Sequence, residues 1–155
     1  MDTKSSLHSE KLLPYTVIFW LITFLFFLRV LGQFLVAHWS TPFLPPMSEW
    51  YSGLIAYPLL LPIQMLILFV MIWISYDFTR GSGFLLVQRR KMGLALQYFS
   101  YVYFGSMVIR YIMTMALHPE RRWFGGAIPI IFHWILAAYI FTLGYFHTRE
   151  HARHV

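Results

Sequence analysis

The chain has 155 residues, of which 59% are hydrophobic, 20% aromatic and 12% charged, with a formal net charge of +6. Soluble domains carry about 25% charged residues, and a fold of this size could not bury so much apolar surface and keep a wettable exterior. These figures exclude a soluble globular domain, a disordered tail and a secreted disulfide module, and they place the chain in a membrane.

The charge distribution and the absence of cysteine narrow the functions further. Most Lys and Arg residues flank hydrophobic runs, where they set orientation and meet anionic lipids, so we expect no nucleic-acid partner. Without cysteine the chain cannot supply a thiolate nucleophile or the ligands of an iron–sulfur cluster. The sequence also lacks the usual phosphate-loop, nucleophile-elbow and zinc-protease motifs, which favours a non-enzymatic role and no catalytic residues.

Four hydrophobic segments long enough to cross a bilayer follow one another along the chain. A spanning helix needs about 20 mostly apolar residues, and backbone groups in hydrocarbon must be paired within the segment, so such runs form helices. The predicted helices cover residues 15–38, 52–76, 92–117 and 127–148. The sequence therefore predicts an all-α membrane protein, a four-transmembrane-helix bundle that forms a single integral membrane domain over residues 1–155.

The connections between the predicted helices are rich in proline and glycine, which favour turns. The first connection, residues 39–51, is semi-apolar as well as proline-rich. We expect it to lie on the membrane surface, with Trp50 among the aromatic residues of the interface.

The positions of Lys and Arg predict the orientation of the bundle. One side holds Lys4, Lys11, Arg80, Arg89, Arg90, Lys91, Arg149 and Arg153, and the other holds Arg121 and Arg122. Because cytoplasmic loops carry the excess of positive charge, both termini are predicted to be cytoplasmic. We expect a multi-pass protein of the cytoplasmic (inner) membrane.

Polar side chains within the predicted helices indicate a site in the outer half of the bundle. Ionisable groups at membrane depth are costly and by default face the protein interior or a wet cavity. Arg29 lies about 13 Å deep in the first helix, with Gln33 one turn further out on the same face. Gln64 lies near the middle of the second helix, and His133 lies about 9 Å deep in the fourth.

The third helix contributes a predicted polar stripe. Tyr103, Ser106, Arg110 and Thr114 follow one another at spacings of three and four residues. Among the few acids of the chain, Glu49 is the one placed to pair with the two arginines at membrane depth. The predicted ligand-binding or partner-binding residues are Arg29, Gln33, Glu49, Gln64, Arg110 and His133.

Simpler structural roles remain open for these residues. Arginines near the end of a span often extend to the headgroups, and a single histidine such as His133 is often a tie between helices. Gln33 and Gln64 could serve only to join helices, at roughly 1 kcal/mol each.

Histidines provide the candidates for a metal or a haem. His147, His151 and His154 are spaced by four and three residues, so a continuing helix would align them on one face and could bind a divalent metal. A haem held by two imidazoles is less favoured, because His38 and His118 lie about 9 Å shallower than His133.

Two functions fit these observations. The favoured one is a non-catalytic subunit or assembly partner of a larger membrane complex, because the arginines at membrane depth outnumber the acids able to pair with them. The alternative is a ligand-binding redox or transport protein whose polar site holds a quinone, a lipid or a haem. Membrane lipids are expected partners in both cases, and other membrane-protein subunits in the first.

Overall fold

The described part of the protein is helical apart from short turns, with no strand in residues 3–39, 43–50, 57–117 and 127–149 of this computed structural model. Its helices are α1 (Thr3–His38), α2 (Met47–Trp50), α3 (Tyr57–Arg80), the 3-10 helix η1 (Phe84–Leu86), α4 (Arg90–Leu117) and α5 (Ala127–Arg149). Four segments are long and apolar enough to cross a membrane, namely Leu12–His38, Tyr57–Arg80, Arg90–Leu117 and Ile128–Arg149. The prediction of an all-helical chain with four potential spans is confirmed.

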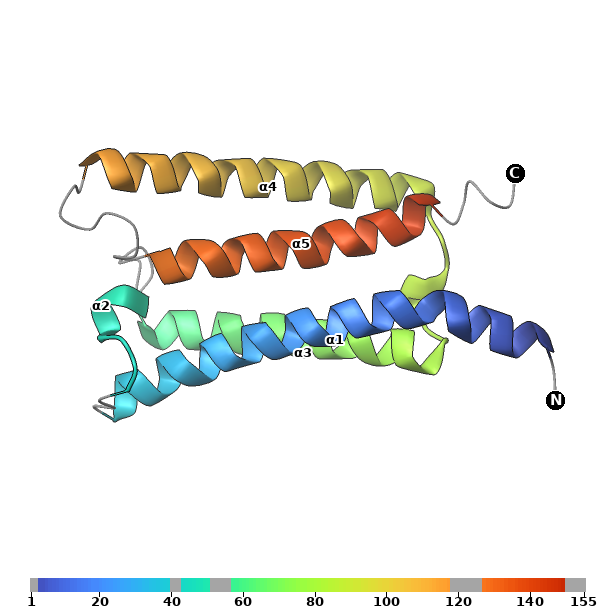
Figure 1. Ribbon diagram of the computed structural model, residues 1–155, viewed down its shortest axis with the longest axis horizontal. Coiled ribbons are helices and arrows are strands. Elements are labelled where there is room, and N and C mark those ends of the chain that lie inside the picture. The colour runs from blue at the N-terminus through green and yellow to red at the C-terminus, as the bar shows by residue number, and fades with distance from the viewer. Residues whose placement is uncertain (1–2, 40–42, 51–56, 118–126, 150–155) are drawn as a thin grey trace.

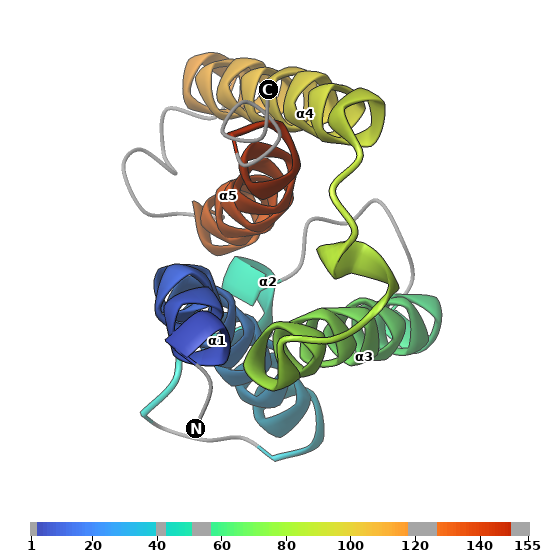
Figure 2. The same ribbon diagram turned by 90° about the vertical axis from the view of Figure 1, so that its right-hand side faces the viewer.

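The four long helices lie in two layers (Figures 1 and 2). α4 packs along α5, α1 packs along α3, and a contact between α1 and α5 joins the layers, whereas α3 and α4 hardly touch. α1 begins and α5 ends at the end of the bundle that carries η1, called the η1 end below (Figure 1). α2 lies at the opposite end, called the α2 end.

α1 and α3 extend by four residues or more beyond their predicted bounds, and α4 and α5 by one or two. α1 begins at Thr3 rather than at residue 15 and continues through Pro14. The prediction followed hydropathy, and the first turns of α1 are polar. α3 ends at Arg80 rather than at residue 76. The next residue, Gly81, ends the helix with a φ of 63°, which glycine adopts without strain. The predicted start of this helix at residue 52 lies outside the described residues.

An aromatic cluster joins α1, α3 and α5 toward the η1 end. The fully buried Phe19 lies 4.7 Å from Phe78 and 4.8 Å from Tyr139, measured between ring centroids. Phe78 also meets Phe146 edge-on at 4.8 Å. Tilted and edge-on ring pairs contribute about 0.5–1.5 kcal/mol each beyond the area they bury. This cluster fixes the relative positions of three helices at one end of the bundle.

The polar groups beside this cluster find their partners within the protein. The Tyr139 hydroxyl donates to the Met71 carbonyl at 2.9 Å, and the Ser75 hydroxyl donates to the same carbonyl at 2.8 Å. The hydroxyls of Thr23 and Ser75 lie 3.1 Å apart. These bonds tie α1, α3 and α5 together at a depth where water is excluded.

Two glycines allow α4 and α5 to approach each other closely. A Cβ atom added to Gly93 would lie 2.8 Å from the Gly144 carbonyl oxygen, and one added to Gly144 would lie 2.8 Å from the Gly93 carbonyl oxygen. Both distances are too short for a side chain, so the pairing of these helices depends on both glycines. Gly105, further along α4, faces open space instead.

Candidate functional site

A cavity of about 260 Å³ lies between the four long helices, toward the α2 end. Its lining residues are Phe26, Arg29, Trp50, Leu60, Ile63, Gln64, Ile67, Tyr103, Met107, Arg110, Pro129, Phe132, His133 and Leu136. Four of the six predicted site residues are therefore brought together in one cavity wall. The described part of that wall contains two guanidinium groups and no carboxylate.

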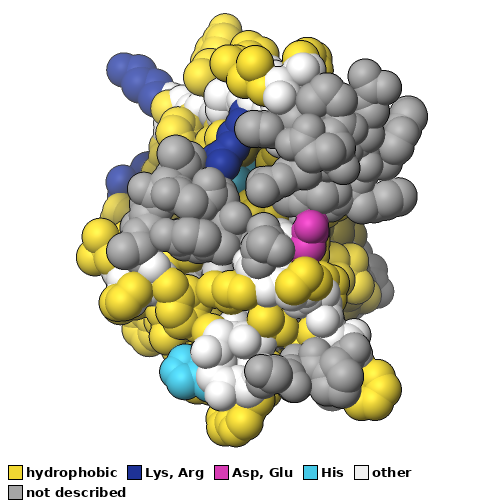
Figure 3. All heavy atoms as spheres, turned by 90° about the vertical axis from the view of Figure 1, so that its left-hand side faces the viewer, with side chains coloured by type: hydrophobic (Ala, Val, Ile, Leu, Met, Phe, Trp, Pro, Cys, Tyr) yellow, Lys and Arg dark blue, Asp and Glu magenta, His cyan; other side chains and the backbone are white. Residues whose placement is uncertain are grey.

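Among the described side chains at the α2 end, hydrophobic ones are the most widespread, with basic, acidic and histidine side chains between them (Figure 3). An arginine could reach solvent or headgroups there only if its side chain emerged at this surface. Arg29 does not emerge, because only 7% of its surface is exposed.

Arg29 is a buried cation, and no carboxylate belongs to the cavity lining as far as the structure describes it. Its guanidinium carbon lies 5.7 Å from the centre of the Phe132 ring, a cation–π contact, and its Nε has no hydrogen-bond partner among the described residues. A buried charge that lacks compensation costs several kcal/mol. A cation–π contact contributes about 0.5–2 kcal/mol, so it offsets only part of that cost.

Arg110 brings a second guanidinium to the cavity from α4. Arg29 and Arg110 both lie close enough to His133 to interact with its ring electrostatically. The cavity therefore concentrates positive charge contributed by α1 and α4 around a histidine of α5.

The predicted polar stripe of α4 is only partly correct. Tyr103 and Arg110 line the cavity, whereas the exposed Ser106 does not and donates its hydroxyl to the Tyr103 carbonyl at 2.7 Å. Thr114 likewise donates to the carbonyl of Arg110, at 2.9 Å. Ser106 and Thr114 thus satisfy their hydroxyls on the backbone of α4 itself and contribute no donor to the described lining of the cavity.

A chain of amides supports one wall of the cavity. Gln64 Nε2 donates to Gln33 Oε1 at 2.9 Å, and Gln33 Nε2 donates to the Trp50 carbonyl at 3.4 Å. Gln33 is fully buried behind the lining, so this predicted site residue acts by holding Gln64. The two glutamine side chains thus connect α1, α2 and α3, which agrees with the structural role considered for them in the sequence.

Trp50 is buried in the bundle and does not join the interfacial aromatic residues among which the sequence placed it. The side chain is only 8% exposed, and its indole N–H donates to the Pro45 carbonyl at 2.9 Å. The ring lies against Gly32, where an added Cβ would stand 2.6 Å from Trp50 Cη2. The missing side chain at Gly32 leaves room for the indole, and burying so large an aromatic surface is favourable.

Glu49, which was predicted to belong to the site, lies beside the cavity rather than in its described lining. Glu49 lies on α2 next to Trp50, is half-buried, and does not belong to the cavity lining. Its backbone N–H donates to the Pro46 carbonyl at 2.9 Å, in the turn that begins α2. This turn carries Trp50 into the cavity lining, whereas Glu49 stays half-buried next to it.

His133 forms a tie between two helices at the cavity. Its Nδ1 atom hydrogen-bonds to the Tyr103 hydroxyl of α4. Tyr103 belongs to the site although the predicted set of site residues omitted it. The signal was present, because Tyr103 precedes Arg110 by two helical turns on one face. Phe132 was also missed, since one more aromatic residue in an apolar span carries no distinguishing signal.

Of the three histidines proposed for a metal, the structure describes His147. His147 is fully buried, and its Nδ1 accepts a hydrogen bond from the Arg89 backbone N–H at 3.3 Å. His151 and His154 lie outside the described residues. Within residues 3–39, 43–50, 57–117 and 127–149, no three His, Asp or Glu side chains are grouped to hold a metal ion.

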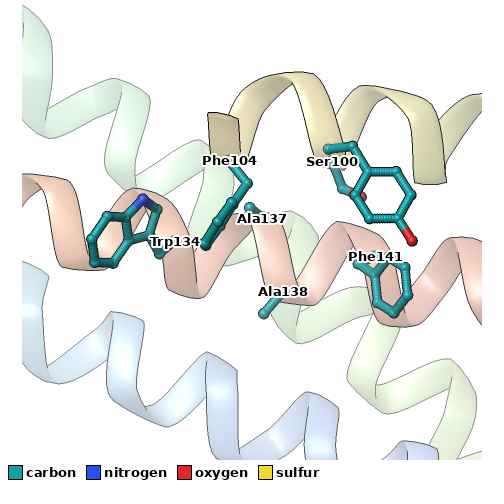
Figure 4. A pocket seen from close by; sticks show the side chains of 7 residues that line it. Ser100, Phe104, Trp134, Ala137, Ala138 and Phe141 are labelled. Atoms are coloured by element: carbon teal, nitrogen blue, oxygen red, sulfur yellow. The ribbon is translucent and has the colours of Figure 1, made fainter. Parts of the chain in front are cut away.

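A second hollow, on the other side of the α4–α5 pair, is apolar. It measures about 330 Å³ and is lined by Ser100, Tyr101, Phe104, Trp134, Ala137, Ala138 and Phe141 (Figure 4). The Ser100 hydroxyl in this lining donates to the Gln97 carbonyl at 2.8 Å. With no charged residue in its lining, this groove suits hydrocarbon, and the charged cavity is the better candidate for a specific site.

No family model, no curated protein and no solved structure matches this chain.

Proposed function

We propose that the protein binds the anionic head group of a membrane lipid in the cavity between its four long helices. The observation that carries this proposal is Arg29, a cation that is 7% exposed, lines the cavity and has an unpartnered Nε. An anionic ligand would compensate the charge of Arg29 and that of Arg110 in a wall that holds no carboxylate.

The chemistry of the lining favours an acid over a neutral ligand. Guanidinium groups present planar N–H donors whose spacing matches the oxygens of a phosphate or carboxylate. A quinone would accept hydrogen bonds from the same donors but would leave both charges uncompensated. A haem held by two imidazoles is disfavoured, because His133 is the one histidine among the described lining residues and bonds Tyr103.

The size and the apolar part of the cavity favour the head of a lipid. Pockets that enclose a drug-sized molecule measure about 300–1,000 Å³, so 260 Å³ is enough for a head group and too little for a whole lipid. Leu60, Ile63 and Ile67 of α3 form an apolar wall opposite the lining residues of α4. Since α3 and α4 hardly touch, acyl chains attached to a bound head have a path into the bilayer between these helices.

Retention of lipid by the purified protein tests this proposal. The protein is extracted in mild detergent, washed with phosphatidylcholine micelles and analysed by native mass spectrometry and by organic extraction. We expect about one anionic phospholipid per chain to survive the wash. Retention of phosphatidylcholine alone, or of one quinone per chain without an anionic lipid, would contradict the proposal.

We also propose the inner-membrane location and the orientation, with both termini and the η1 end cytoplasmic, on the basis of the eight-to-two division of Lys and Arg. Because the chain has no cysteine, single cysteines report the side of the membrane cleanly. The exposed Ser82, beside η1, and the exposed Phe43, beside α2, suit this test. In intact cells an impermeant maleimide should label Phe43→Cys and leave Ser82→Cys unlabelled, and the reverse pattern would invert the proposed orientation.

A role as a subunit of a larger membrane complex is the second candidate. The observation that favours it is the exposure of α4. In the most apolar stretch of α4 11% of the residues are buried, compared with 44% in α1. Another membrane protein could cover this surface. The particle mass in the extraction experiment distinguishes the two candidates, because a subunit should run with a second transmembrane chain at fixed stoichiometry.

A further inference from the structure

The amide of Gln64 has a defined orientation because three groups are bonded in series. The Trp50 carbonyl can only accept a hydrogen bond, so Gln33 must turn its NH₂ group toward it. The Oε1 atom of Gln33 then faces Gln64 and accepts from the Gln64 NH₂ group at 2.9 Å. Gln64 is left with its carbonyl oxygen as the remaining polar atom, and that oxygen has no hydrogen-bond partner among the described residues.

Two buried atoms of the cavity wall therefore lack hydrogen-bond partners among the described residues. One is an acceptor, Gln64 Oε1, and the other is a donor, Arg29 Nε. Gln64 is 3% exposed and Arg29 is 7% exposed, and both line the cavity. A buried polar group that lacks a partner costs about 1–3 kcal/mol. A ligand that offers only acceptor oxygens, such as a carboxylate or a simple phosphate diester, satisfies Arg29 and leaves Gln64 Oε1 unsatisfied.

We infer that the ligand carries a hydroxyl donor close to its phosphate, as a phosphoglycerol group does. The phosphate pairs with Arg29 and Arg110, and the hydroxyl donates to Gln64 Oε1. This inference rests on the proposed function and adds a requirement for a donor to it. The same phosphoglycerol chemistry occurs in phosphatidylglycerol and in soluble glycerol phosphate, and the apolar wall contributed by α3 favours the lipid.

A pair of lipids that differ in the hydroxyls provides the test. Phosphatidylglycerol and phosphatidylmethanol with matched acyl chains carry the same charge, but the methyl ester has no hydroxyl. We expect the wild-type protein in phosphatidylcholine nanodiscs to bind phosphatidylglycerol about five- to ten-fold more tightly, the effect of one neutral hydrogen bond. Gln64→Leu and Gln64→Met should each bind the two lipids with equal affinity, because neither side chain carries the amide oxygen that accepts from the hydroxyl.

The outcomes separate this inference from the proposed function. Equal affinity of the wild-type protein for the two lipids would overturn the inference and leave anion binding intact. Binding of neither lipid would overturn the proposed function itself. Displacement of the lipid by soluble glycerol phosphate, and not by methyl phosphate, would support the donor requirement and identify the soluble compound as the source.

Discussion

Replacing Arg29 with glutamine is expected to weaken binding of an anionic lipid by about 10- to 150-fold and, without ligand, to stabilise the protein. The loss of affinity follows from hydrogen bonds to a charged group, which contribute about 1.5–3 kcal/mol, where 1.4 kcal/mol corresponds to a factor of ten. The gain in stability follows from removing a buried charge that no carboxylate of the cavity wall compensates. Lipid titration by native mass spectrometry and thermal unfolding in phosphatidylcholine micelles measure the two effects.

Arg89→Gln is the matched control for this experiment. Arg89 is exposed near the η1 end and stacks over Phe84 at 4.2 Å, far along the chain from every lining residue of the cavity. Its replacement should change neither the lipid affinity nor the melting temperature appreciably. If Arg29→Gln destabilised the protein and left the affinity unchanged, Arg29 would be a structural residue and the proposed function would fail.

Adding a single methyl group at Gly93 is expected to separate α4 from α5 and to destabilise the bundle by about 1–3 kcal/mol or more. An alanine Cβ at this position would lie 2.8 Å from both the Gly144 carbonyl oxygen and the His147 Cβ. Neither neighbour can move without a shift of α5, and overpacking of this kind costs about 1–3 kcal/mol. Small residues let helix backbones approach each other in a membrane, where packing rather than hydrophobic burial drives association.

Gly105→Ala is the control for Gly93→Ala because both lie in α4. A Cβ at Gly105 would meet no atom within 4 Å. Alanine should therefore be tolerated there and could stabilise the helix by about 1 kcal/mol through its higher helix propensity. Reversible unfolding in mixed micelles compares the two variants, and equal stability would show that the observed α4–α5 approach is not the native one.

Sequence reasoning predicted the architecture because the signal for spanning helices is strong and local. A run of about 20 apolar residues can satisfy its backbone groups in hydrocarbon only as a helix, so each span can be predicted separately. The convergence of Arg29, Gln64, Arg110 and His133 could also be predicted, since ionisable and amide groups avoid lipid and must turn toward one another.

The parts that were wrong or missed depend on contacts between segments distant in the sequence. In the sequence alone Trp50 has the character of an interfacial residue. Its burial depends on Gly32, whose missing side chain leaves the space that the indole fills. Glu49 seemed placed for the arginines by its charge, but one residue along a turn of helix decides which side chain enters the bundle. The helix ends at Thr3 and Arg80 exceeded the predictions because polar turns continue a helix without adding hydropathy.

The weak contact between α3 and α4 has a mechanical consequence. α3 is anchored by α1 and α4 by α5, and the two pairs meet along the contact of α1 with α5. α2 also contacts α5 at the end beside Arg29, so few contacts other than those of α1 and α2 with α5 hold the two pairs together, and the seam between α3 and α4 is left with little packing. If the cavity holds a lipid head group as proposed above, the acyl chains would pass through this seam, and the molecule would enter sideways from the hydrocarbon layer, head first, without passing through water.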